Sequence, residues 1–181
     1  MIFQFTGLGK NCVISPRPNI DERGFFARTF CSELFESHGL NKTWVQSNIS
    51  MSVYPGTLRG LHFQSAPHSE VKLIRCISGA IWDVVCDVRP SSDTFGKWYG
   101  ARLDGINRKM MYVPEGFAHG FISMQPNSEI FYLVSSAYCP SAEKTLLWND
   151  TTVSIKWPQL PSVISEKDKK GITLKNLLKY L

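Results

Sequence analysis

Gly56-Thr57-Leu58-Arg59-Gly60-Leu61-His62-Phe63-Gln64 is the most informative segment of this chain, and Pro114-Glu115-Gly116-Phe117-Ala118-His119-Gly120-Phe121 has the same character. Each segment places one histidine among apolar residues flanked by glycine, which is typical of a short β-strand. Side chains alternate between the two faces of a regular strand, so Arg59 and His62 should point to opposite sides. If both serve one pocket, Gly60 marks a β-bulge or a bend.

Strand-like segments recur along the whole chain. They are rich in β-branched and aromatic residues and are separated by Gly, Pro, Asn and Asp, which indicates an antiparallel sandwich or barrel. The predicted strands are residues 24–30, 43–53, 57–64, 71–77, 80–88, 98–103, 109–113, 120–124, 129–136 and 153–157. Helical character is limited to residues 32–38, with Ser32 as N-cap and Gly39 as terminator, and to residues 174–181. The sequence therefore predicts an all-β fold with short peripheral helices.

Length and composition indicate one domain that spans residues 1–181. Of the 181 residues, 43% are hydrophobic and 19% are charged, as in ordinary globular domains. No apolar run approaches the ~20 residues that cross a bilayer, and the first residues lack the features of a signal peptide. Five scattered cysteines without a C-x-x-C pair indicate a reduced, cytoplasmic chain rather than a disulfide framework or a zinc ribbon.

The net charge of +5 is concentrated at one end of the chain. Six lysines against two acidic residues follow residue 155, and the rest of the chain is nearly neutral. Nucleic-acid binding usually requires a basic face on the fold itself, so a solvated basic end is weak evidence for it. We therefore predict neither a nucleic-acid partner nor a membrane partner.

One predicted strand carries a polar face. Gln46, Asn48 and Ser50 share one parity in segment 43–53, whereas Ile49 and Met51 share the other. A barrel whose interior is large enough for a ligand would explain such a polar face.

The two histidine segments resemble the two half-motifs of the cupin superfamily, whose fold is a small jelly-roll barrel. Metal-binding cupins have His-x-His and a following Glu in the first half-motif and another His in the second, a set that suits a divalent ion. Here Gln64 takes the place of the second histidine, and glutamine is a poor ligand. We predict a metal-free barrel; the alternative is a metal-dependent cupin isomerase or dioxygenase that uses His62, His119 and Glu70.

Further motifs surround the two histidine segments in a fixed order. They are Asp21-Glu22-Arg23-Gly24-Phe25-Phe26, Gln46-x-Asn48, Lys72-Leu73, Asp83-Val84-Val85-x-Asp87-x-Arg89, Tyr132, Tyr138, Trp148-Asn149-Asp150 and Ser165-Glu166-Lys167-Asp168. This ordered set closely resembles the dTDP-4-dehydrorhamnose 3,5-epimerase family over essentially residues 10 to 170. The resemblance implies a homodimeric isomerase without cofactor or metal. It would epimerise a nucleotide-linked 4-keto-6-deoxy sugar at C3, C5 or both, in the biosynthesis of deoxysugars and surface-polysaccharide precursors.

The resemblance also implies catalytic roles for four residues. His62 is the base, Asp168 orients and charges its imidazole, Tyr132 is the acid, and Lys72 stabilises the developing enolate. A ketone at C4 acidifies the hydrogens at C3 and C5, so a base can form an enolate and an acid on the opposite face can return a proton with inversion. From the residues alone, Lys72 and Asp168 would be surface residues and Tyr132 would belong to the core.

Binding residues follow from the same resemblance. Arginine side chains suit phosphate oxygens, so Arg23 and Arg59 are expected to hold the diphosphate. Tyr138 is expected to stack on the nucleobase. Further contacts with the substrate are assigned to Gln46, Asn48, His119, Glu143 and Lys167.

One position departs from the family pattern. Many members have Glu two residues after Phe-Phe, where its side chain helps to hold the nucleotide, whereas this chain has Ala27-Arg28. Arg28 reverses the local charge, which leaves the nucleobase open. Alternatively, Arg28 is a surface residue that pairs with an acidic group.

A non-catalytic sugar-nucleotide-binding cupin is the remaining alternative. Such a protein would bind its ligand without exchanging protons between sugar and solvent. The presence of the whole set His62, Lys72, Tyr132 and Asp168 argues against it.

Overall fold

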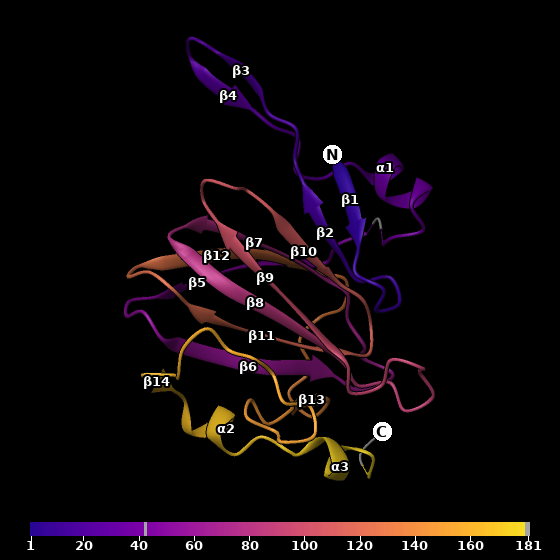
Figure 1. Cartoon of the computed structure of the whole chain (residues 1–181). Helices are drawn as coiled ribbons and strands as arrows, with labels where there is room; N and C mark the ends of the chain where they lie inside the picture. The colour runs from indigo at the N-terminus through magenta and orange to yellow at the C-terminus, as the bar shows by residue number, and fades with distance from the viewer. Residues whose placement is uncertain (42, 180–181) are drawn as a thin grey trace.

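Two β-sheets lie face to face in the computed structural model, which describes residues 1–41 and 43–179 (Figure 1). The first sheet has the order β1 (Ile2–Phe5), β2 (Cys12–Ser15), β10 (Met110–Val113), β7 (Lys72–Ser78), β12 (Ser128–Val134) and β5 (Gln46–Ser52). The second has the order β13 (Glu143–Thr145), β6 (Thr57–Gln64), β11 (Phe117–Ser123), β8 (Ala80–Asp87) and β9 (Trp98–Asp104), with β14 (Val163–Ile164) parallel to β6.

One hairpin and three short helices lie outside these sheets. The hairpin of β3 (Asn19–Asp21) and β4 (Gly24–Phe26) extends away from the body of the molecule in Figure 1 and is followed by α1 (Ser32–Ser37). Helices α2 (Glu166–Lys169) and α3 (Leu174–Leu177) belong to the C-terminal segment. No helix among the described residues has the length and apolar character needed to cross a bilayer. The predicted all-β cupin jelly roll with short peripheral helices is confirmed.

Apolar side chains from both sheets fill the space between them. Ile74 of β7 and Met111 of β10 belong to the same cluster as Ile81 and Val85 of β8 and Phe117 of β11, and all five are buried. Each such side chain contributes roughly 1.5 to 3 kcal/mol through burial. This core fixes the separation of the sheets, so polar side chains elsewhere on the same inner faces can enclose a cavity.

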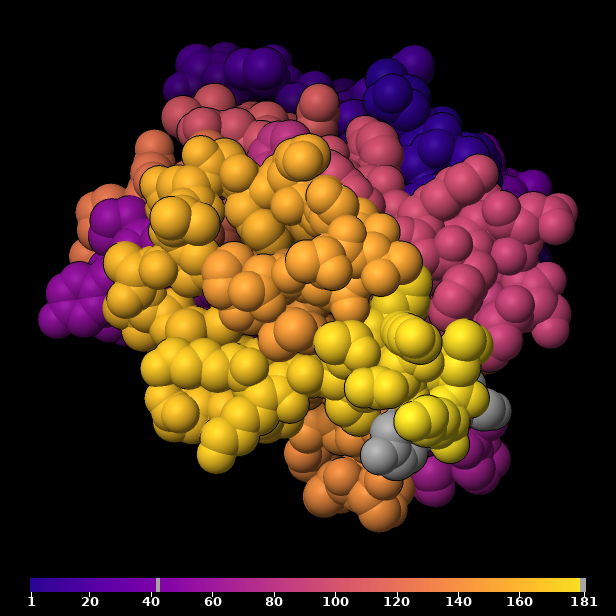
Figure 2. Space-filling model, turned by 60° about the horizontal axis from the view of Figure 1, so that its bottom comes forward, coloured from indigo at the N-terminus to yellow at the C-terminus, as the bar shows by residue number. Residues whose placement is uncertain are grey.

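The C-terminal segment covers the outer face of the second sheet. Leu61 of β6 and Val84 of β8 pack there with Leu146, Leu174 and Leu177, which are all buried. Figure 2 shows this segment in orange and yellow across the face turned to the viewer. Its lysines are exposed, as predicted for a solvated basic end, but its leucines anchor it to the sheet.

The prediction of a strand at residues 153–157 is wrong. This segment consists of a turn and an irregular stretch, in which Asp150 Oδ1 accepts the N–H of Val153 at 3.0 Å and Ser154 has a φ of +52°. Its apolar residues alternate because Val153 and Trp157 pack on the covered face of the second sheet. Packing of an irregular segment therefore produced a strand-like pattern.

The remaining differences concern short elements and element ends. Strands β1, β2, β3, β13 and β14 and helix α2 were not predicted, because at two to four residues each they are too short to give a periodic pattern. Strand β4 ends at Phe26, well before residue 30, and β11 begins at Phe117 rather than residue 120. The N-cap of α1 is Cys31 and not Ser32, and it forms no side-chain cap hydrogen bond. Helix α3 ends at Leu177, and residues 180–181 of the predicted helix lie outside the described residues.

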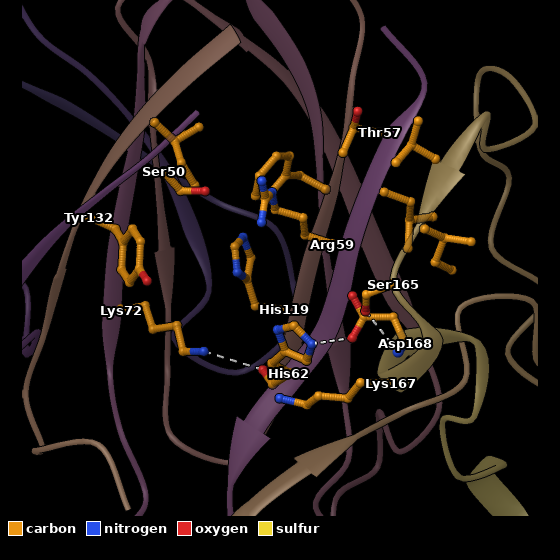
Figure 3. Close-up of a pocket in the computed structure, with 15 residues that line it drawn as sticks. Ser50, Thr57, Arg59, His62, Lys72, His119, Tyr132, Ser165, Lys167 and Asp168 are labelled. Atoms are coloured by element: carbon orange, nitrogen blue, oxygen red, sulfur yellow. Dashed lines mark hydrogen bonds and ion pairs between the residues drawn. The ribbon is translucent and has the colours of Figure 1, made fainter. Parts of the chain in front are cut away.

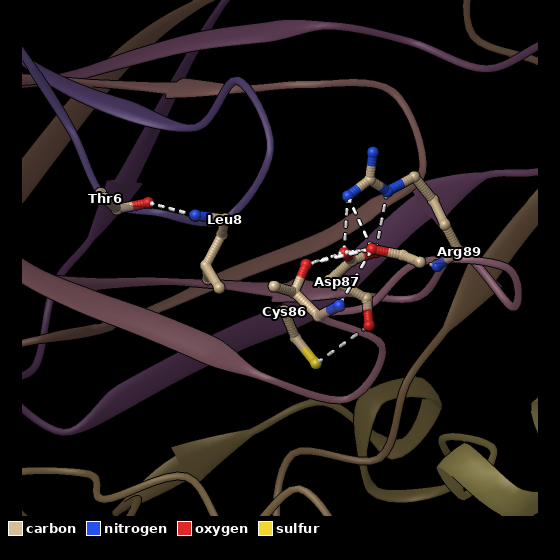
Figure 4. A network of polar contacts seen from close by, with 7 residues as sticks. Thr6, Leu8, Cys86, Asp87 and Arg89 are labelled. Carbon is tan, nitrogen blue, oxygen red and sulfur yellow. Dashed lines mark hydrogen bonds and ion pairs between the residues drawn. The ribbon is translucent and has the colours of Figure 1, made fainter.

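A charged cluster fixes the loop between β8 and β9 (Figure 4). The buried carboxylate of Asp87 accepts hydrogen bonds from Arg89 at 2.6 and 2.9 Å and from the hydroxyls of Ser92 and Thr94 at 2.6 and 2.5 Å. The Arg89 guanidinium also lies 4.7 Å from the ring centre of Phe117. Burial alone would raise the pKa of Asp87, but these hydrogen bonds outweigh it and lower the pKa to about 2.

Replacement of Asp87 by asparagine should therefore destabilise the fold in a pH-dependent way. The folded-state pKa lies below the usual 3.8, so the carboxylate stabilises the protein fully above that value and progressively less as pH falls toward 2. One pKa unit corresponds to about 1.4 kcal/mol, so Asp87→Asn should lower the free energy of unfolding at neutral pH by roughly 2 to 3 kcal/mol. Urea unfolding at neutral pH and near pH 3 measures the effect. An equal loss at both pH values would contradict this account.

Candidate active site

A β-bulge brings Arg59 and His62 to the same side of β6. On the paired strand β11, His119 lies opposite His62 but Phe121 lies opposite Arg59, so β6 has one residue more between the two pairs. Gly60 has a φ of +117°, and a Cβ there would come within 2.6 Å of a backbone atom of β11. Only glycine fits this conformation and this close approach. The bulge predicted from the sequence is confirmed.

His62 and Asp168 form a hydrogen-bonded pair (Figure 3). His62 Nε2 lies 2.6 Å from Asp168 Oδ1, and Asp168 is almost fully buried on α2. The other carboxylate oxygen accepts the N–H of Gly60 at 3.2 Å, and Ser165 caps α2 by accepting the N–H of Asp168. Burial alone would raise the pKa of Asp168, but His62 and the N–H of Gly60 lower it below its usual value. Asp168 is therefore ionised at neutral pH.

This contact determines which nitrogen of His62 can act as a base. An ionised carboxylate only accepts hydrogen bonds, so His62 Nε2 carries the proton that bonds to Asp168. Nδ1 of the neutral ring then has a free lone pair. Figure 3 shows that this nitrogen faces the cavity.

Tyr132 and Lys72 face His62 from the opposite sheet (Figure 3). Tyr132 comes from β12 and Lys72 from the start of β7, and both line the cavity that His62 lines. Burial and the charge of Glu70 raise the pKa of Tyr132, and Arg59 opposes them only in part. The phenol therefore keeps its proton at neutral pH and is available as an acid.

These side chains line a cavity of about 480 Å³ between the two sheets. A second hollow of about 340 Å³ shares His62, Lys72 and Tyr132 with it. The two spaces thus share the three residues to which the family resemblance assigns proton transfer and enolate stabilisation. The arrangement can hold an elongated ligand with its reactive part at the junction.

Lys72 is fixed by two contacts. Its ammonium lies 2.9 Å from Glu70 Oε1 and donates to the backbone oxygen of His62 at 3.3 Å. Both side chains of the ion pair are only 11% exposed. The structure therefore overturns the reading of Lys72 as a solvated surface residue that the sequence alone would give.

A second histidine–aspartate pair lies beside the first. His119 Nε2 is 2.7 Å from Asp83 Oδ1, and Asp83 on β8 is fully buried. His119 lines the larger cavity, as expected of a substrate contact. Asp83 belongs to one of the motifs that carry the family resemblance, but no feature of the sequence indicates that it contacts the site.

Four of the eight predicted substrate contacts line the smaller hollow. Gln46 and Glu143 both lie there and both contact Tyr138. Gln46 Oε1 accepts the backbone N–H of Tyr138 at 2.8 Å, and the Tyr138 hydroxyl donates to Glu143 at 2.9 Å. Asn48 lies in the same hollow. Lys167 pairs with Glu143 at 2.6 Å and lines the larger cavity.

Arg59 and Arg23, the two predicted diphosphate ligands, lie in different places. Arg59 lines the larger cavity and donates to the backbone oxygen of Met51 at 2.9 Å. Arg23 lies at the tip of the projecting hairpin, pairs with Asp21 and is 83% exposed in its side chain. Arg28 is exposed after the same hairpin. Within one copy of the chain, the structure does not bring Arg23 to the cavity.

The residues of the metal-dependent alternative all have other partners. His62 and His119 each contact a buried aspartate, and Glu70 contacts Lys72. In residues 1–41 and 43–179, no three His, Cys, Asp or Glu side chains are grouped so that they could hold a metal ion. The metal-dependent alternative therefore has no ligand set in this part of the chain.

Comparison with known proteins places these features in context. The family model for dTDP-4-dehydrorhamnose 3,5-epimerase matches residues 6–176. The dTDP-4-dehydrorhamnose 3,5-epimerase of Shigella flexneri is 41% identical over 160 residues, which is 88% of each chain.

Solved structures agree with this match. The dTDP-4-dehydrorhamnose 3,5-epimerase of Elizabethkingia anophelis superposes with a TM-score of 0.92 at 39% identity and covers 97% of both chains. The epimerase of Legionella pneumophila in complex with dTDP-4-keto-L-rhamnose has a TM-score of 0.90 at 34% identity, over 96% of this chain and 93% of that one.

Proposed function

The chain belongs to the dTDP-4-dehydrorhamnose 3,5-epimerase family, and we propose that it inverts C3, C5 or both of a nucleotide-linked 4-keto-6-deoxy sugar. The observation that carries this proposal is the junction of the two hollows, where a base, an acid and a cation converge from different strands. A non-catalytic binding protein would have no need of this set.

The residues supply each step of the reaction. His62 Nδ1 removes the proton from the carbon next to the ketone, and the electron pair of the broken C–H bond moves into an enolate whose negative charge rests on the C4 oxygen. The Lys72 ammonium stabilises that oxygen electrostatically. Tyr132 then returns a proton to the carbon from the opposite face, which inverts the centre.

The surroundings of His62 and Tyr132 keep each side chain in the protonation state that its proposed role requires. Asp168 stays ionised and holds the imidazole with Nδ1 free, while burial holds the phenol of Tyr132 in its protonated form. Positioned proton transfers of this kind typically contribute about 10² to 10⁴-fold each. Neither step requires a cofactor, and we propose a metal-free reaction.

The substrate class follows from the outer part of the site. The Legionella pneumophila relative is solved with a dTDP-linked 4-keto sugar, and we propose a ligand of the same class here. Arg59 and Lys167 offer cations for the diphosphate, and the exposed ring of Tyr138 offers a stacking surface for the base. We place the activity in deoxysugar and surface-polysaccharide precursor biosynthesis.

We also propose that the protein is a homodimer. Strand β5 is the edge of the first sheet, and its outward side chains Ile49 and Met51 are 63% and 50% exposed. Ile20 and Phe26 on the projecting hairpin are exposed as well. A second copy would cover these apolar surfaces, and the hairpin of one copy would bring Arg23 to the cavity of the other.

A cytoplasmic location is part of the proposal. All five cysteines are free thiols, as expected in a reducing compartment.

Incubation with a dTDP-linked 4-keto-6-deoxy sugar in D₂O tests the function and the role of Tyr132 together. The wild type should place deuterium at C3, C5 or both and should invert the labelled centres. Tyr132→Phe removes only the phenolic proton donor. The enolate should still form and recapture a deuteron from the His62 side, so exchange should persist while inversion is lost.

NMR and mass spectrometry of the recovered sugar distinguish the outcomes. Absence of exchange and inversion in the wild type would refute the proposed function for that sugar class. Equal loss of exchange and inversion in Tyr132→Phe would assign Tyr132 to binding or packing instead of protonation.

Mixed dimers test the position of Arg23. His62→Ala should lower turnover by more than ~10²-fold, and Arg23→Ala should weaken substrate binding by roughly 1.5 to 3 kcal/mol.

In a dimer of one His62→Ala chain and one Arg23→Ala chain, one site then carries both substitutions and the other carries neither. Differently tagged chains allow the mixed dimer to be isolated, and its activity below saturation should exceed that of both parent variants. If Arg23 served the cavity of its own chain, both sites of the mixed dimer would be impaired and no activity would return.

A further inference from the structure

Glu70 lies beside the proposed catalytic residues but takes no part in the chemistry assigned so far. One residue, Val71, separates it from the start of β7, and its side chain is 11% exposed. Oε1 lies 2.9 Å from the ammonium of Lys72, and Glu70 lines the hollow that also holds His62 and Tyr132. A carboxylate at this position therefore borders the place where negative charge would develop on the substrate.

The lysine side chain needs such a partner to hold a fixed position. Lysine has a flexible four-carbon stem and a compact charge that sets no direction of its own. Here the ammonium is held from two sides, by Glu70 Oε1 and by the backbone oxygen of His62 at 3.3 Å. Together the two contacts place it next to the strand that carries the base.

The carboxylate of Glu70 is itself held. Its other oxygen accepts a hydrogen bond from Gln64 Nε2 at 3.3 Å, and Gln64 is 3% exposed. Gln64 also donates to the backbone oxygen of Ala137 and accepts the N–H of Cys139 at 2.6 Å. A metal-binding cupin has a histidine at the position of Gln64. Here Gln64 orients Glu70, and Glu70 in turn orients Lys72.

We propose that Glu70 is a positioning residue of the epimerisation, which acts through Lys72 by holding its ammonium where the enolate oxygen forms. This role rests on the proposed function. It differs from the role of Glu70 as a metal ligand, because both of its oxygens already have partners in the protein. It also differs from a purely structural role in holding the 65–70 loop, because the effect must pass through Lys72.

The electrostatics of Tyr132 support this placement. The negative charge of Glu70 is one cause of the raised pKa of Tyr132, after burial, and Arg59 opposes it. The carboxylate of Glu70 therefore lies close to Tyr132 as well as to Lys72. Burial is the larger cause of the raised pKa and keeps the phenol protonated without Glu70, so the effect of Glu70 on turnover passes through Lys72.

A double-mutant cycle tests the proposal. Glu70→Gln removes the charge and keeps the size of the side chain, and Lys72→Met removes the ammonium and keeps most of the stem. Deuterium incorporation and inversion are measured for the wild type, both single variants and the double variant. Glu33→Gln on α1, an exposed glutamate, serves as the matched control.

Glu70→Gln should lower kcat by at least about tenfold, since a misplacement of about 1 Å can cost more than this, while KM changes less than about threefold. Exchange and inversion should fall together, because enolate formation itself becomes slower. In the Lys72→Met background, Glu70→Gln should have no further effect, as expected when one residue acts only through the other. Glu33→Gln should match the wild type.

Four outcomes would overturn the inference. A kcat of Glu70→Gln within about twofold of the wild type would show that the lysine needs no partner. An equal loss in the Lys72→Met background, or a matching loss of dTDP affinity in calorimetry, would show that Glu70 holds the loop instead. Inactivity of the wild type would refute the proposed function and this role with it, whereas the first three results leave the proposed function intact.

Discussion

The arrangement of the site depends on the hydrogen bonds that the buried carboxylate of Asp168 accepts. One oxygen accepts from His62 and the other accepts the N–H of Gly60, so a single buried group holds both the base and the bulge that exposes it. Asp168 comes from α2 in the C-terminal segment, and the leucines of that segment fasten it to the outer face of the second sheet. The basic end of the chain therefore contributes a residue to the proposed active site.

Two further groups of the site follow the same rule. Three groups with a proposed role toward the substrate thus have a buried or nearly buried acid behind them: Asp168 behind His62, Asp83 behind His119 and Glu70 behind Lys72. A charge or ring that is paired in this way keeps one orientation, and preorganisation of this kind lowers the cost of reaching the transition state. The two sheets then place the base and the acid on opposite sides of one cavity.

The sequence predicts much of this arrangement, but for different reasons at different residues. The Gly60 bulge follows from strand parity once the family resemblance assigns Arg59 and His62 to one cavity, because the two side chains of a regular strand would point to opposite sides. The burial of Lys72 and Asp168 could be expected only from the family resemblance, since charged residues in a strand and in a lysine-rich turn usually lie at the surface. No local pattern indicates that Asp83 pairs with His119, because this contact joins β8 to β11. Glu70 and Lys72 are only two residues apart, but two charges at this spacing do not by themselves predict that the pair is buried at the cavity.

Two further features were beyond the reach of the sequence. The apolar alternation of residues 153–157 is the same for a strand and for an irregular segment packed on a sheet, so periodicity could not separate them. Arg23 belongs to a motif that the family resemblance links to ligand binding, but it lies on a projecting hairpin, and its proposed place in the site requires a second copy of the chain.

The central claim is that Asp168 holds the His62 imidazole with Nδ1 free to act as the base. The most direct test is to measure which ring nitrogen of His62 carries the proton. Nitrogen-15 NMR of the wild type, recorded where the imidazole is neutral, should show the proton on Nε2 and a free Nδ1, and Asp168→Asn should lose this preference because an amide can also donate. His119, which is held by Asp83, should be unchanged in that variant. A wild-type His62 with its proton on Nδ1 would contradict the account, since the nitrogen that has to accept the substrate proton would already carry one.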